Sequence, residues 1–438
     1  MNELVDRVSS SDIDLEAYFA RLAYANSPLS PDIRDTVSVI LNEIEHRGDE
    51  ALVKYCNQLD GRQLTSSKEL ALELIDLEKA FKNLSDDDRS ALHLAASRIQ
   101  KYHEYQLENS GEFIYVDEHG NRLGQTVNPL NRVGVYIPGG QAAYPSTVLM
   151  TVIPARVAGV KEVVMMVPAP GGRCPEIVLA AAHIGGVNEV YTAGGAQAIG
   201  AMAFGTETIM PVDKIVGPGG AYVAAAKREV FGQVGIDVIA GPSELLIIAD
   251  GTVSPEWIVL DMFSQAEHAS DAQAILLCPE KEYLDQIYSL IGQMLPKMER
   301  VDIIRESLSQ RGALIKTSNL EECVRIANLL APEHLELATK NPENLVGGIY
   351  NAGAVFLGAQ SPEVMGDYNA GPSHVLPTSG TARFSSPLGV YDFQKRTSII
   401  ELSKTGSNDL AGSAELLANR EGLFAHGQAA KARKQEVD

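Results

Sequence analysis

The sequence predicts an α/β protein with two doubly wound lobes, each built on a parallel sheet, and a helical C-terminal tail. Two series of short apolar, β-branched segments alternate with helical segments, which is the pattern of parallel strands covered by helices on both faces. Glycine- and proline-rich turns punctuate both series. At 438 residues the chain is long enough for two or three domains, each with its own core.

Parts of different character follow one another along the chain. From about residue 32 to residue 104, apolar residues recur at three- and four-residue spacing, which predicts amphipathic helices. A series of β-branched segments, each followed by a helix-like stretch, begins at Arg132 and predicts βαβ units. A second such series begins at Gly241, and after Thr378 the alternation gives way to a charged, helical tail.

The order of these parts predicts a discontinuous domain. If the opening helices pack with the second series, the first series is an insertion between them. The predicted division is an N-terminal arm, residues 1–30; a first lobe, residues 31–130 and 242–380; a second lobe, residues 131–241; and a tail, residues 381–438. We expect the ligand site in a cleft between the lobes.

The composition argues against several classes of protein. Lys and Arg number 36 against 57 Asp and Glu, a formal net charge of −21, so nucleic acid and anionic membranes are not expected partners. The four cysteines are far apart and have no C-x-x-C pairing, which argues against a disulfide framework and a thiolate metal site. No secretion signal or membrane-spanning apolar segment is visible, and we expect a cytoplasmic protein.

Glycine-rich turns lie at the ends of several predicted strands, at residues 137–140, 193–200, 217–220 and 240–244. Glycine permits close approach of the backbone, and α/β sheets bind ligands at the carboxyl ends of their strands. None of the turns has the G-x-G-x-x-G or G-x-x-x-x-G-K-[ST] pattern of a nucleotide site. They mark a ligand-facing edge or are ordinary strand-to-helix connections.

Two motifs combine histidine with a second functional side chain. In SQAEH, Gln265 and His268 are three residues apart at the end of a predicted helix and can reach one ion; a histidine that stabilises the helix dipole is the simpler interpretation. In APEHLEL, Glu333 and His334 can act as an acid/base pair. Adjacent strand residues point to opposite faces, so a working pair requires irregular backbone there.

Two later segments carry further candidates. MGDYNAGPSHVLPTSG shows little regular pattern and contains Asp367 and His374, which are candidate ligands or substrate contacts unless the segment is a flexible linker. The tail segment EGLFAHG adds Glu421 and His426.

The chain resembles the histidinol dehydrogenase family in a series of segments that follow the family's order: VGVYIPGG, GGAQAIGAMAFGT, DKIVGPG, AGPSE, SQAEH, PEHLE, GDYNAGPSHVLPT and DFQKR. The resemblance extends from Arg47 into the tail. It implies a zinc-dependent homodimer that oxidises L-histidinol to L-histidine through an aldehyde, reducing two NAD, in histidine biosynthesis. It also implies lobes that are incomplete Rossmann-like units, in agreement with the missing dinucleotide fingerprint.

The same resemblance implies roles for individual residues. Zinc is expected at Gln265, His268, Asp367 and His426, and substrate contacts are expected at Ser243, Gln265, His268, His334, Asp367, His374, Glu421 and His426. His334 is implied as the general base for the substrate hydroxyl, and Glu333 as the residue that activates water. The tail is implied to be exchanged between subunits, so that each active site is shared.

The NAD contacts implied by the resemblance are Tyr136, Gln197 and Gly220. Gly220 stands where the family usually has Asn, so this chain lacks one side-chain amide at the cofactor edge. The glycine at position 220 can therefore change the affinity for NAD or the choice of cofactor. The predictions of the fold and of the zinc residues do not depend on it.

Three other functions remain open. A related dehydrogenase would oxidise another small alcohol, such as a sulfonated diol, because fold and base survive a change of substrate. A non-enzymatic two-lobed protein would bind a small molecule in its cleft, and a zinc hydrolase would use a metal-bound water without NAD. GPSHVLPT and LFAHG favour histidinol, since they carry the implied contacts for its imidazole and amino groups.

Overall fold

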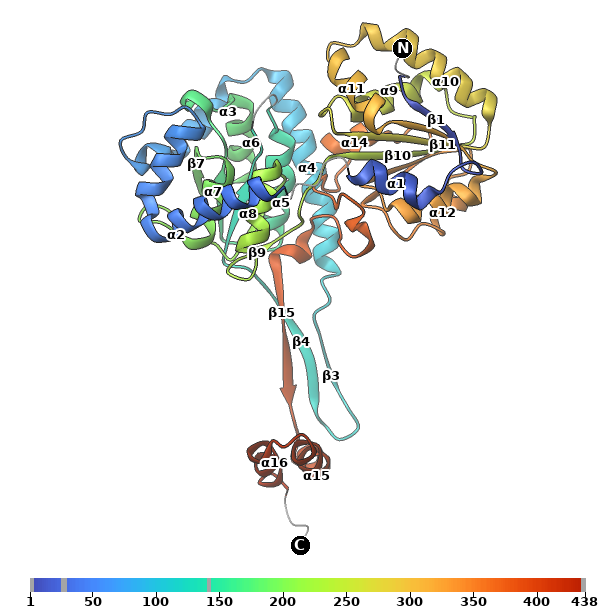
Figure 1. Ribbon diagram of the computed structural model, residues 1–438. Helices are drawn as coiled ribbons and strands as arrows, with labels where there is room; N and C mark the ends of the chain where they lie inside the picture. The colour runs from blue at the N-terminus through green and yellow to red at the C-terminus, as the bar shows by residue number, and fades with distance from the viewer. Residues whose placement is uncertain (1–3, 25–29, 140–142, 435–438) are drawn as a thin grey trace.

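The computed structural model describes residues 4–24, 30–139 and 143–434. Two α/β lobes, here called lobe A and lobe B, lie side by side, and a thin stalk extends from between them to a pair of helices (Figure 1). This architecture confirms the predicted fold class of two parallel-sheet lobes with a helical C-terminus. In the part of the chain that is described, no helix is both long and apolar enough to cross a membrane.

Lobe A is built on a six-stranded parallel sheet. In spatial order its strands are β1 (Asp6–Ser9), β12 (Ala313–Lys316), β11 (Gln273–Cys278), β10 (Glu244–Ala249), β13 (His334–Ala338) and β14 (Ala354–Leu357). Successive side chains of β10 alternate between two cores: Leu245 and Ile247 pack in one, Leu246 and Ile248 in the other. A strand buried on both faces must be apolar throughout, which explains the run ELLIIA.

Helices cover both faces of this sheet. The first core contains α9 (Pro255–Ala266), α10 (Lys281–Met294) and α11 (Val301–Arg311), and the second contains α1 (Leu15–Tyr24) and α12 (Leu320–Leu330). Three short elements complete the lobe: η3 (Leu295–Lys297), α13 (Glu343–Val346) and α14 (Glu363–Tyr368).

Lobe B has the same two-sided design. Its strands, in spatial order, are β2 (Ala71–Leu72), β7 (Glu189–Tyr191), β6 (Glu162–Met166), β5 (Arg132–Tyr136), β8 (Lys214–Val216) and β9 (Gly235–Ile236). All pairs are parallel except β2 with β7. One core contains α2 (Pro31–Leu59), α7 (Gly195–Phe204) and α8 (Ala221–Val230); the other contains α3 (Leu74–Asn83), α4 (Asp86–Glu108), α5 (Pro145–Val157) and α6 (Glu176–Gly185). The lobe also has η1 (Ser67–Leu70) and η2 (Pro170–Gly172).

The predicted domain division is wrong in two respects. The opening helices pack on lobe B, α2 against α7 and α8 and α3 against α6, so residues 31–130 do not join residues 242–380. The described residues 4–24 of the predicted N-terminal arm are not separate, because β1 pairs with β12 and adds an edge strand to lobe A. An amphipathic helix shows that one of its faces is buried, but its periodicity does not identify the sheet that it covers.

The stalk is a three-stranded antiparallel sheet of β3 (Phe113–Val116), β4 (Arg122–Pro129) and β15 (Gln394–Glu401). It ends in α15 (Lys404–Arg420) and α16 (Phe424–Lys431), and η4 (Thr381–Arg383) and η5 (Val390–Phe393) precede it. Strands β3 and β4 approach so closely that a Cβ at Gly124 would collide with the Phe113 carbonyl. The predicted tail therefore contains a strand before its helices, and this strand pairs with a hairpin more than two hundred residues earlier in the chain.

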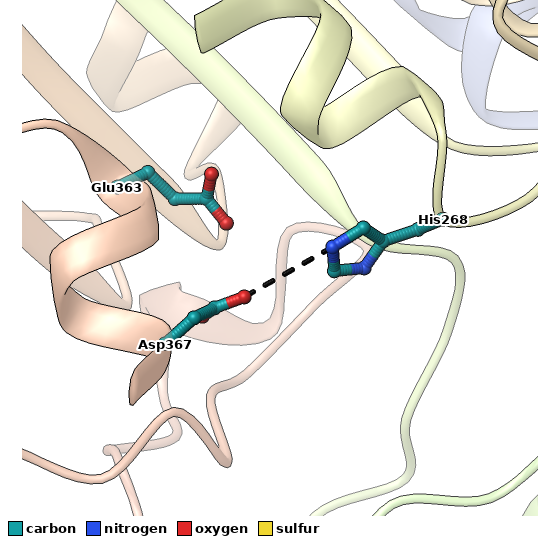
Figure 2. A group of neighbouring side chains, drawn as sticks. All are labelled: His268, Glu363 and Asp367. Carbon is teal, nitrogen blue, oxygen red and sulfur yellow. Dashed lines mark ion pairs between the residues drawn. The ribbon is translucent and has the colours of Figure 1, made fainter. Parts of the chain in front are cut away.

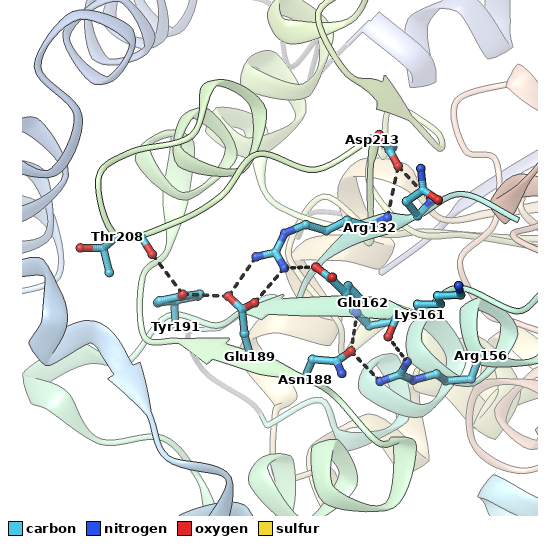
Figure 3. A network of polar contacts seen from close by, with 11 residues as sticks. Arg132, Arg156, Lys161, Glu162, Asn188, Glu189, Tyr191, Thr208 and Asp213 are labelled. Carbon is cyan, nitrogen blue, oxygen red and sulfur yellow. Dashed lines mark hydrogen bonds and ion pairs between the residues drawn. The ribbon is translucent and has the colours of Figure 1, made fainter.

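A polar network fixes the amino ends of three strands in lobe B (Figure 3). Arg132 on β5 donates to Glu162 on β6 at 2.7 Å and to both carboxylate oxygens of Glu189 on β7, at 2.8 and 2.9 Å. The Tyr191 hydroxyl donates to Glu189 at 2.8 Å. Because the Arg132 side chain is only 8% exposed, these bonds supply its counter-charges and lock the strand register.

Candidate active site

Glu333 and His334 lie at the amino end of β13, beside β10. The main chain of Glu244 contacts both: its N–H donates to Glu333 Oε2 at 2.8 Å, and its carbonyl accepts from His334 Nδ1 at 3.1 Å. Glu333 Oε2 is 3.7 Å from His334 Nδ1. Glu333 precedes the first strand residue, so strand alternation does not apply to it and the two side chains converge.

A second group of side chains adjoins this pair. His268 follows α9, and Glu363 and Asp367 lie on α14; their ligand atoms are within 4.8 Å of one another. Figure 2 shows the three side chains directed toward a common point, with His268 Nε2 4.0 Å from Asp367 Oδ2. His334 Nε2 is 3.6 Å from Asp367 Oδ1 and 4.0 Å from Glu363 Oε1. We call these three residues the cation cluster, and we call Glu333 and His334 the catalytic pair after their predicted role. The pair and the cluster form one site.

Burial and charge change the proton affinities of this site. Burial raises the pKa of Glu333 to about 8 and that of Glu363 to about 8. Burial by itself would lower the pKa of His334, but the carboxylates of Glu333, Asp367 and Glu363 outweigh it and raise the pKa to about 10. A carbonyl only accepts hydrogen bonds, so the Glu244 carbonyl requires a proton on Nδ1, and Nε2 is the nitrogen that faces the cluster.

Gln265 supports the interpretation of the cluster as a cation site. The side chain is fully buried, and neither of its amide atoms has a hydrogen-bond partner among the described residues. Leaving buried polar atoms unpaired costs about 1–3 kcal/mol, so a ligand is expected there. Amide oxygen, imidazole nitrogen and carboxylate form a donor set that suits zinc. The residues present therefore fit the implied metal.

His374 joins this site to lobe B. Its Nδ1 donates to the main-chain carbonyl of Asp367 at 3.0 Å, and its Nε2 is 3.0 Å from Oγ1 of Thr147 on α5. Burial lowers the pKa of His374, so the neutral ring accepts from the Thr147 hydroxyl at Nε2. The segment 365–380 is therefore an ordered part of the site and not a flexible linker.

A cavity of about 880 Å³ opens beside these residues. His334, Asp367 and His374 line it from one side, and Arg98 and Tyr102 of α4 line it from lobe B. The volume is in the range of small-molecule sites. The cavity thus lies between the lobes, where the sequence predicts the ligand.

The remaining predicted substrate contacts are separated in a single chain. Ser243 lies just before β10, and its carbonyl accepts the N–H of Gln273. Glu421 directly follows α15, and His426 lies on α16, at the far end of the stalk (Figure 1). One copy of the chain does not bring these two residues to the site.

The predicted NAD contacts lie at the carboxyl edge of the sheet of lobe B. The buried Tyr136 hydroxyl accepts the Gly195 N–H at 3.1 Å, and burial raises the pKa of Tyr136 to about 12. Gln197 is fully buried and its Oε1 has no partner in the described part of the chain. Around a Cβ built at Gly220 nothing lies within 4 Å, so this position has room for a side chain.

One glycine-rich turn does not fit the predicted ligand-facing edge. The turns after β5, β7 and β8 lie at carboxyl ends, although Gly140 of the first turn is outside the described residues. Residues 240–244 instead lead into β10 at its amino end, so the expectation of a carboxyl-edge turn is wrong there. The site of lobe A is built around the amino ends of β10 and β13.

Three further residues of the site, Glu363, Glu244 and Thr147, are not among the predicted ones. Glu363 precedes Asp367 by four residues, a spacing that places both on one helix face, but α14 has only six residues and gives little periodic signal. Behind it, Glu336 Oε1 accepts the Glu363 N–H at 2.6 Å, and burial raises the pKa of Glu336 well above its ordinary value. The site is therefore rich in carboxyl groups that resist ionisation.

Known proteins match this chain over nearly its whole length. The sequence profile of a family described as histidinol dehydrogenase matches residues 25–434. A histidinol dehydrogenase of Chromobacterium violaceum is 52% identical over 430 residues, 98% of this chain and 99% of that protein. One of Nitrosomonas europaea is 52% identical over 431 residues, again 98% and 99%.

A solved structure shows the same architecture. The crystal structure of histidinol dehydrogenase from Elizabethkingia anophelis matches with a TM-score of 0.92 at 36% identity, over 99% of this chain and 98% of that chain. Both lobes and the stalk are included in a match of this extent.

Proposed function

Because this chain belongs to the histidinol dehydrogenase family, we propose that it oxidises L-histidinol to L-histidine through histidinal, reducing two NAD, in the last steps of histidine biosynthesis. The observation that carries the proposal is the 3.6 Å approach of His334 Nε2 to Asp367 Oδ1. It places a proton acceptor directly beside a set of donors that suits a substrate-binding cation.

Zinc is the proposed metal. Gln265, His268 and Asp367 would hold it, and His426 of a second copy would complete the set. When bound, zinc supplies an anchor for the imidazole and amino groups of histidinol and orients the carbinol carbon. His374 and Ser243 are the proposed further contacts in the first copy, and Glu421 is the proposed contact from the second.

His334 is the proposed general base. Its Nδ1–H is held by the Glu244 carbonyl, so Nε2 accepts the hydroxyl proton of the substrate. Loss of that proton makes the carbinol carbon a better hydride donor, and NAD supplies the acceptor. In this proposal Nδ1 orients the imidazole ring, and Nε2 accepts the proton.

Glu333 is the proposed base for the second oxidation. A carboxylate whose pKa burial has raised to about 8 accepts a proton from water more readily than an ordinary carboxylate. Water activated in this way adds to the aldehyde, and the second hydride leaves from the hydrate. The Glu244 N–H fixes the carboxylate for this step at 2.8 Å.

The proposed NAD site is the carboxyl edge of lobe B at Tyr136, Gln197 and Gly220. The unpaired, buried Oε1 of Gln197 is an acceptor available to a ligand. Three strands end in glycine-rich turns at this edge, which lets a dinucleotide approach the backbone. NAD bound there would face the cavity between the lobes.

A homodimer is the proposed assembly. Large apolar side chains are exposed along β3 and on the stalk helices: Phe113, Ile114, Tyr115, Val116, Leu416, Leu417 and Phe424. Exposed apolar groups of this extent mark protein contacts. In the proposal a second copy covers them, and the exchanged stalks carry Glu421 and His426 into neighbouring active sites. The four free cysteines agree with a reducing compartment, and we place the enzyme in the cytoplasm.

The experiment that tests the function counts products. Purified, zinc-loaded protein is mixed with L-histidinol and NAD, and the NADH formed is compared with the histidine formed. Two NADH per histidine is the expected result. Absence of NADH from a folded, zinc-loaded dimer would refute the proposal.

The other functions predict different results in the same assay. A sulfonated diol oxidised in place of histidinol would identify a related dehydrogenase. Product formation without NAD would identify a hydrolase. If the parent protein binds histidinol but does not oxidise it, the protein is a non-enzymatic binder. If the protein is an enzyme, the parent turns histidinol over, and the Glu333→Gln variant still binds histidinol but has lost turnover.

A further inference from the structure

Glu244, the first residue of β10, is the one residue in the described part of the chain whose main chain holds both side chains of the catalytic pair. Its N–H donates to Glu333 Oε2 at 2.8 Å, and its carbonyl accepts the His334 Nδ1 proton at 3.1 Å. The first bond orients the carboxylate of one base, and the second selects the tautomer of the other. Any movement of this residue therefore moves both bases.

The side chain of Glu244 is itself fixed. It is 7% exposed, and its Oε1 accepts the Ser379 N–H at 3.2 Å. A second bond joins the same two segments, because the Gly241 N–H donates to Thr378 Oγ1 at 2.6 Å. The segments approach so closely that a Cβ at Gly241 would collide with the Ser379 hydroxyl.

The fixed segment continues toward the substrate site. Residues 374–379 run from His374, which lines the main cavity, to Ser379, whose N–H donates to the Glu244 carboxylate. On its other side, Glu244 lines a separate cavity of about 480 Å³ together with Gln273 and the buried Arg311. Glu244 therefore fills the space between that second cavity and the catalytic pair.

We propose that Glu244 is a positioning residue of the oxidation, whose buried carboxylate holds the main chain that aligns Glu333 and His334. The inference rests on the proposed function for its consequence and on the hydrogen bonds for its geometry. If the carboxylate does not reach Ser379, the Ser379 N–H is left unpaired beside a cavity, and the hydrogen bond that holds residue 244 against residue 379 is lost. Displacement of catalytic groups by about 1 Å lowers rates by up to about 100-fold.

The two oxidations should respond differently. The Glu333 carboxylate is oriented by one main-chain hydrogen bond, from Glu244, whereas the His334 imidazole is also held by its ion pair with Asp367 at 3.6 Å. Loosening Glu244 should therefore affect water activation by Glu333 more than proton removal by His334. Aldehyde formed in the first step would then leave the enzyme before the second.

Two substitutions separate reach from charge. Glu244→Asp keeps the charge and shortens the side chain, so Ser379 is out of reach; Glu244→Gln keeps the reach and an acceptor oxygen. Gln273→Ala is the matched control, because Gln273 is level with Glu244 on β11, is equally buried at 7% and lines the same second cavity. Among the described residues, Gln273 makes no hydrogen bond to the side chains of Glu333 or His334.

We expect Glu244→Asp to lower kcat by about 10-fold or more at KM values within about twofold of the parent. The ratio of NADH to histidine should rise above two, with free aldehyde trapped by a hydrazine reagent. Glu244→Gln and Gln273→Ala should stay within about threefold of the parent in kcat. The inference is overturned if Glu244→Asp has the same kcat as Gln273→Ala. It is also overturned if Glu244→Asp and Glu244→Gln lose kcat equally and both still form two NADH per histidine.

A measurement without turnover separates this inference from the proposed function. The hydrogen-bonded Nδ1 proton of His334 should give a protected NMR signal in the parent and in Glu244→Gln, and the signal should be lost in Glu244→Asp. Persistence of the signal in Glu244→Asp would overturn the positioning role even in a protein that makes no NADH. A parent without NADH but with the expected signals would refute only the proposed reaction.

Discussion

The imidazole of His334 and the carboxylate of Asp367 lie 3.6 Å apart, and each favours the charged form of the other. Burial opposes ionisation of Asp367, but the ion pair with His334 and the other nearby histidines hold its pKa at about 2. The three carboxylates around His334 overcome burial and raise its pKa to about 10. A histidine with that pKa is protonated at neutral pH, so it acts as a base only when positive charge is added at the cluster.

The first prediction concerns the effect of the metal on His334. In metal-free protein we expect His334 to stay protonated through neutral pH, and zinc at the cluster to lower its pKa into the neutral range, because a cation disfavours the imidazolium. Ring carbon NMR of labelled histidine, titrated with and without zinc, measures both values. His334→Gln assigns the signal, and equal pKa values in the two forms would contradict the prediction.

The second prediction concerns Glu363, whose buried Oε1 has no hydrogen-bond partner among the described residues. It lies in the cation cluster, and loss of its charge should weaken metal binding. We expect Glu363→Gln to lower zinc affinity by about 10–100-fold, the usual effect of altering a group at a metal site. Competition with a chelator measures the affinity.

Glu321→Gln on α12 is the control for Glu363→Gln, because its carboxylate is exposed and α12 covers the face of the sheet opposite to α9, the helix that α14 contacts. It removes the same charge from the chain and should leave zinc affinity unchanged. Equal affinity in the parent and in Glu363→Gln would exclude Glu363 from the cation site.

The fold was predictable where local patterns determine it. Apolar runs such as residues 244–249 predict buried parallel strands, and the structure confirms them in both lobes. The partners of the opening helices were not predictable, because the apolar stripe of α2 fits any apolar surface. Its actual partner is α7, where Gly200 lets Leu41 and Ile44 pack closely. The stalk was missed because β4 pairs with β15, far away in sequence.

The site was predictable only in part for a related reason. His334 and Glu333 are adjacent and form a recognisable pair, and Gln265 with His268 has helical spacing. Glu363 and Glu244 act through positions that no local pattern reveals. Glu244 contributes its main chain, which is the same in every residue except proline.

The third prediction concerns stability at the polar network of lobe B. Hydrogen bonds from Arg132 hold the pKa of Glu189 below its ordinary value of 4.5. A lowered folded-state pKa stabilises the fold above pH 4.5, and the contribution is lost as pH falls through the folded value. Glu189→Gln should therefore lower Tm at about pH 7 by about 2–4 °C, and by less at about pH 4. Calorimetry at both pH values measures the difference.

Glu162→Gln is the comparison within the same network. Glu162 is 53% exposed and accepts one hydrogen bond from Arg132, whereas Glu189 accepts two. The substitution should cost less than Glu189→Gln at neutral pH. A Glu189→Gln effect that is equal at both pH values would show that packing and not charge is responsible.

The fourth prediction concerns the departure at Gly220. Its φ of −65° suits any residue and nothing lies within 4 Å of a Cβ there, so Gly220→Asn should fold like the parent. A restored amide at the proposed cofactor edge should lower KM for NAD by about 2- to 10-fold, the worth of one hydrogen bond. Gly220→Ala is the control and should leave KM unchanged. An unchanged KM in Gly220→Asn would place NAD away from this turn.

The fifth prediction concerns shared active sites. The structure places Glu333 in lobe A and His426 at the end of the stalk, so an exchanged dimer would combine them from different copies. Glu333→Gln and His426→Ala should each be inactive as homodimers. When the two are unfolded together and refolded, heterodimers form in which one site receives both substitutions and the other receives neither. Random pairing should then restore about one quarter of the parental activity.

The mixing experiment distinguishes exchange from a site completed within one chain. If His426 reached the site of its own copy, every site in the mixture would contain one substitution and no activity would return. Refolding Glu333→Gln with His334→Gln is the control, because both residues belong to the same lobe and no pairing produces an intact site. Activity in the first mixture and none in the second would establish that the stalk delivers His426 to its neighbour.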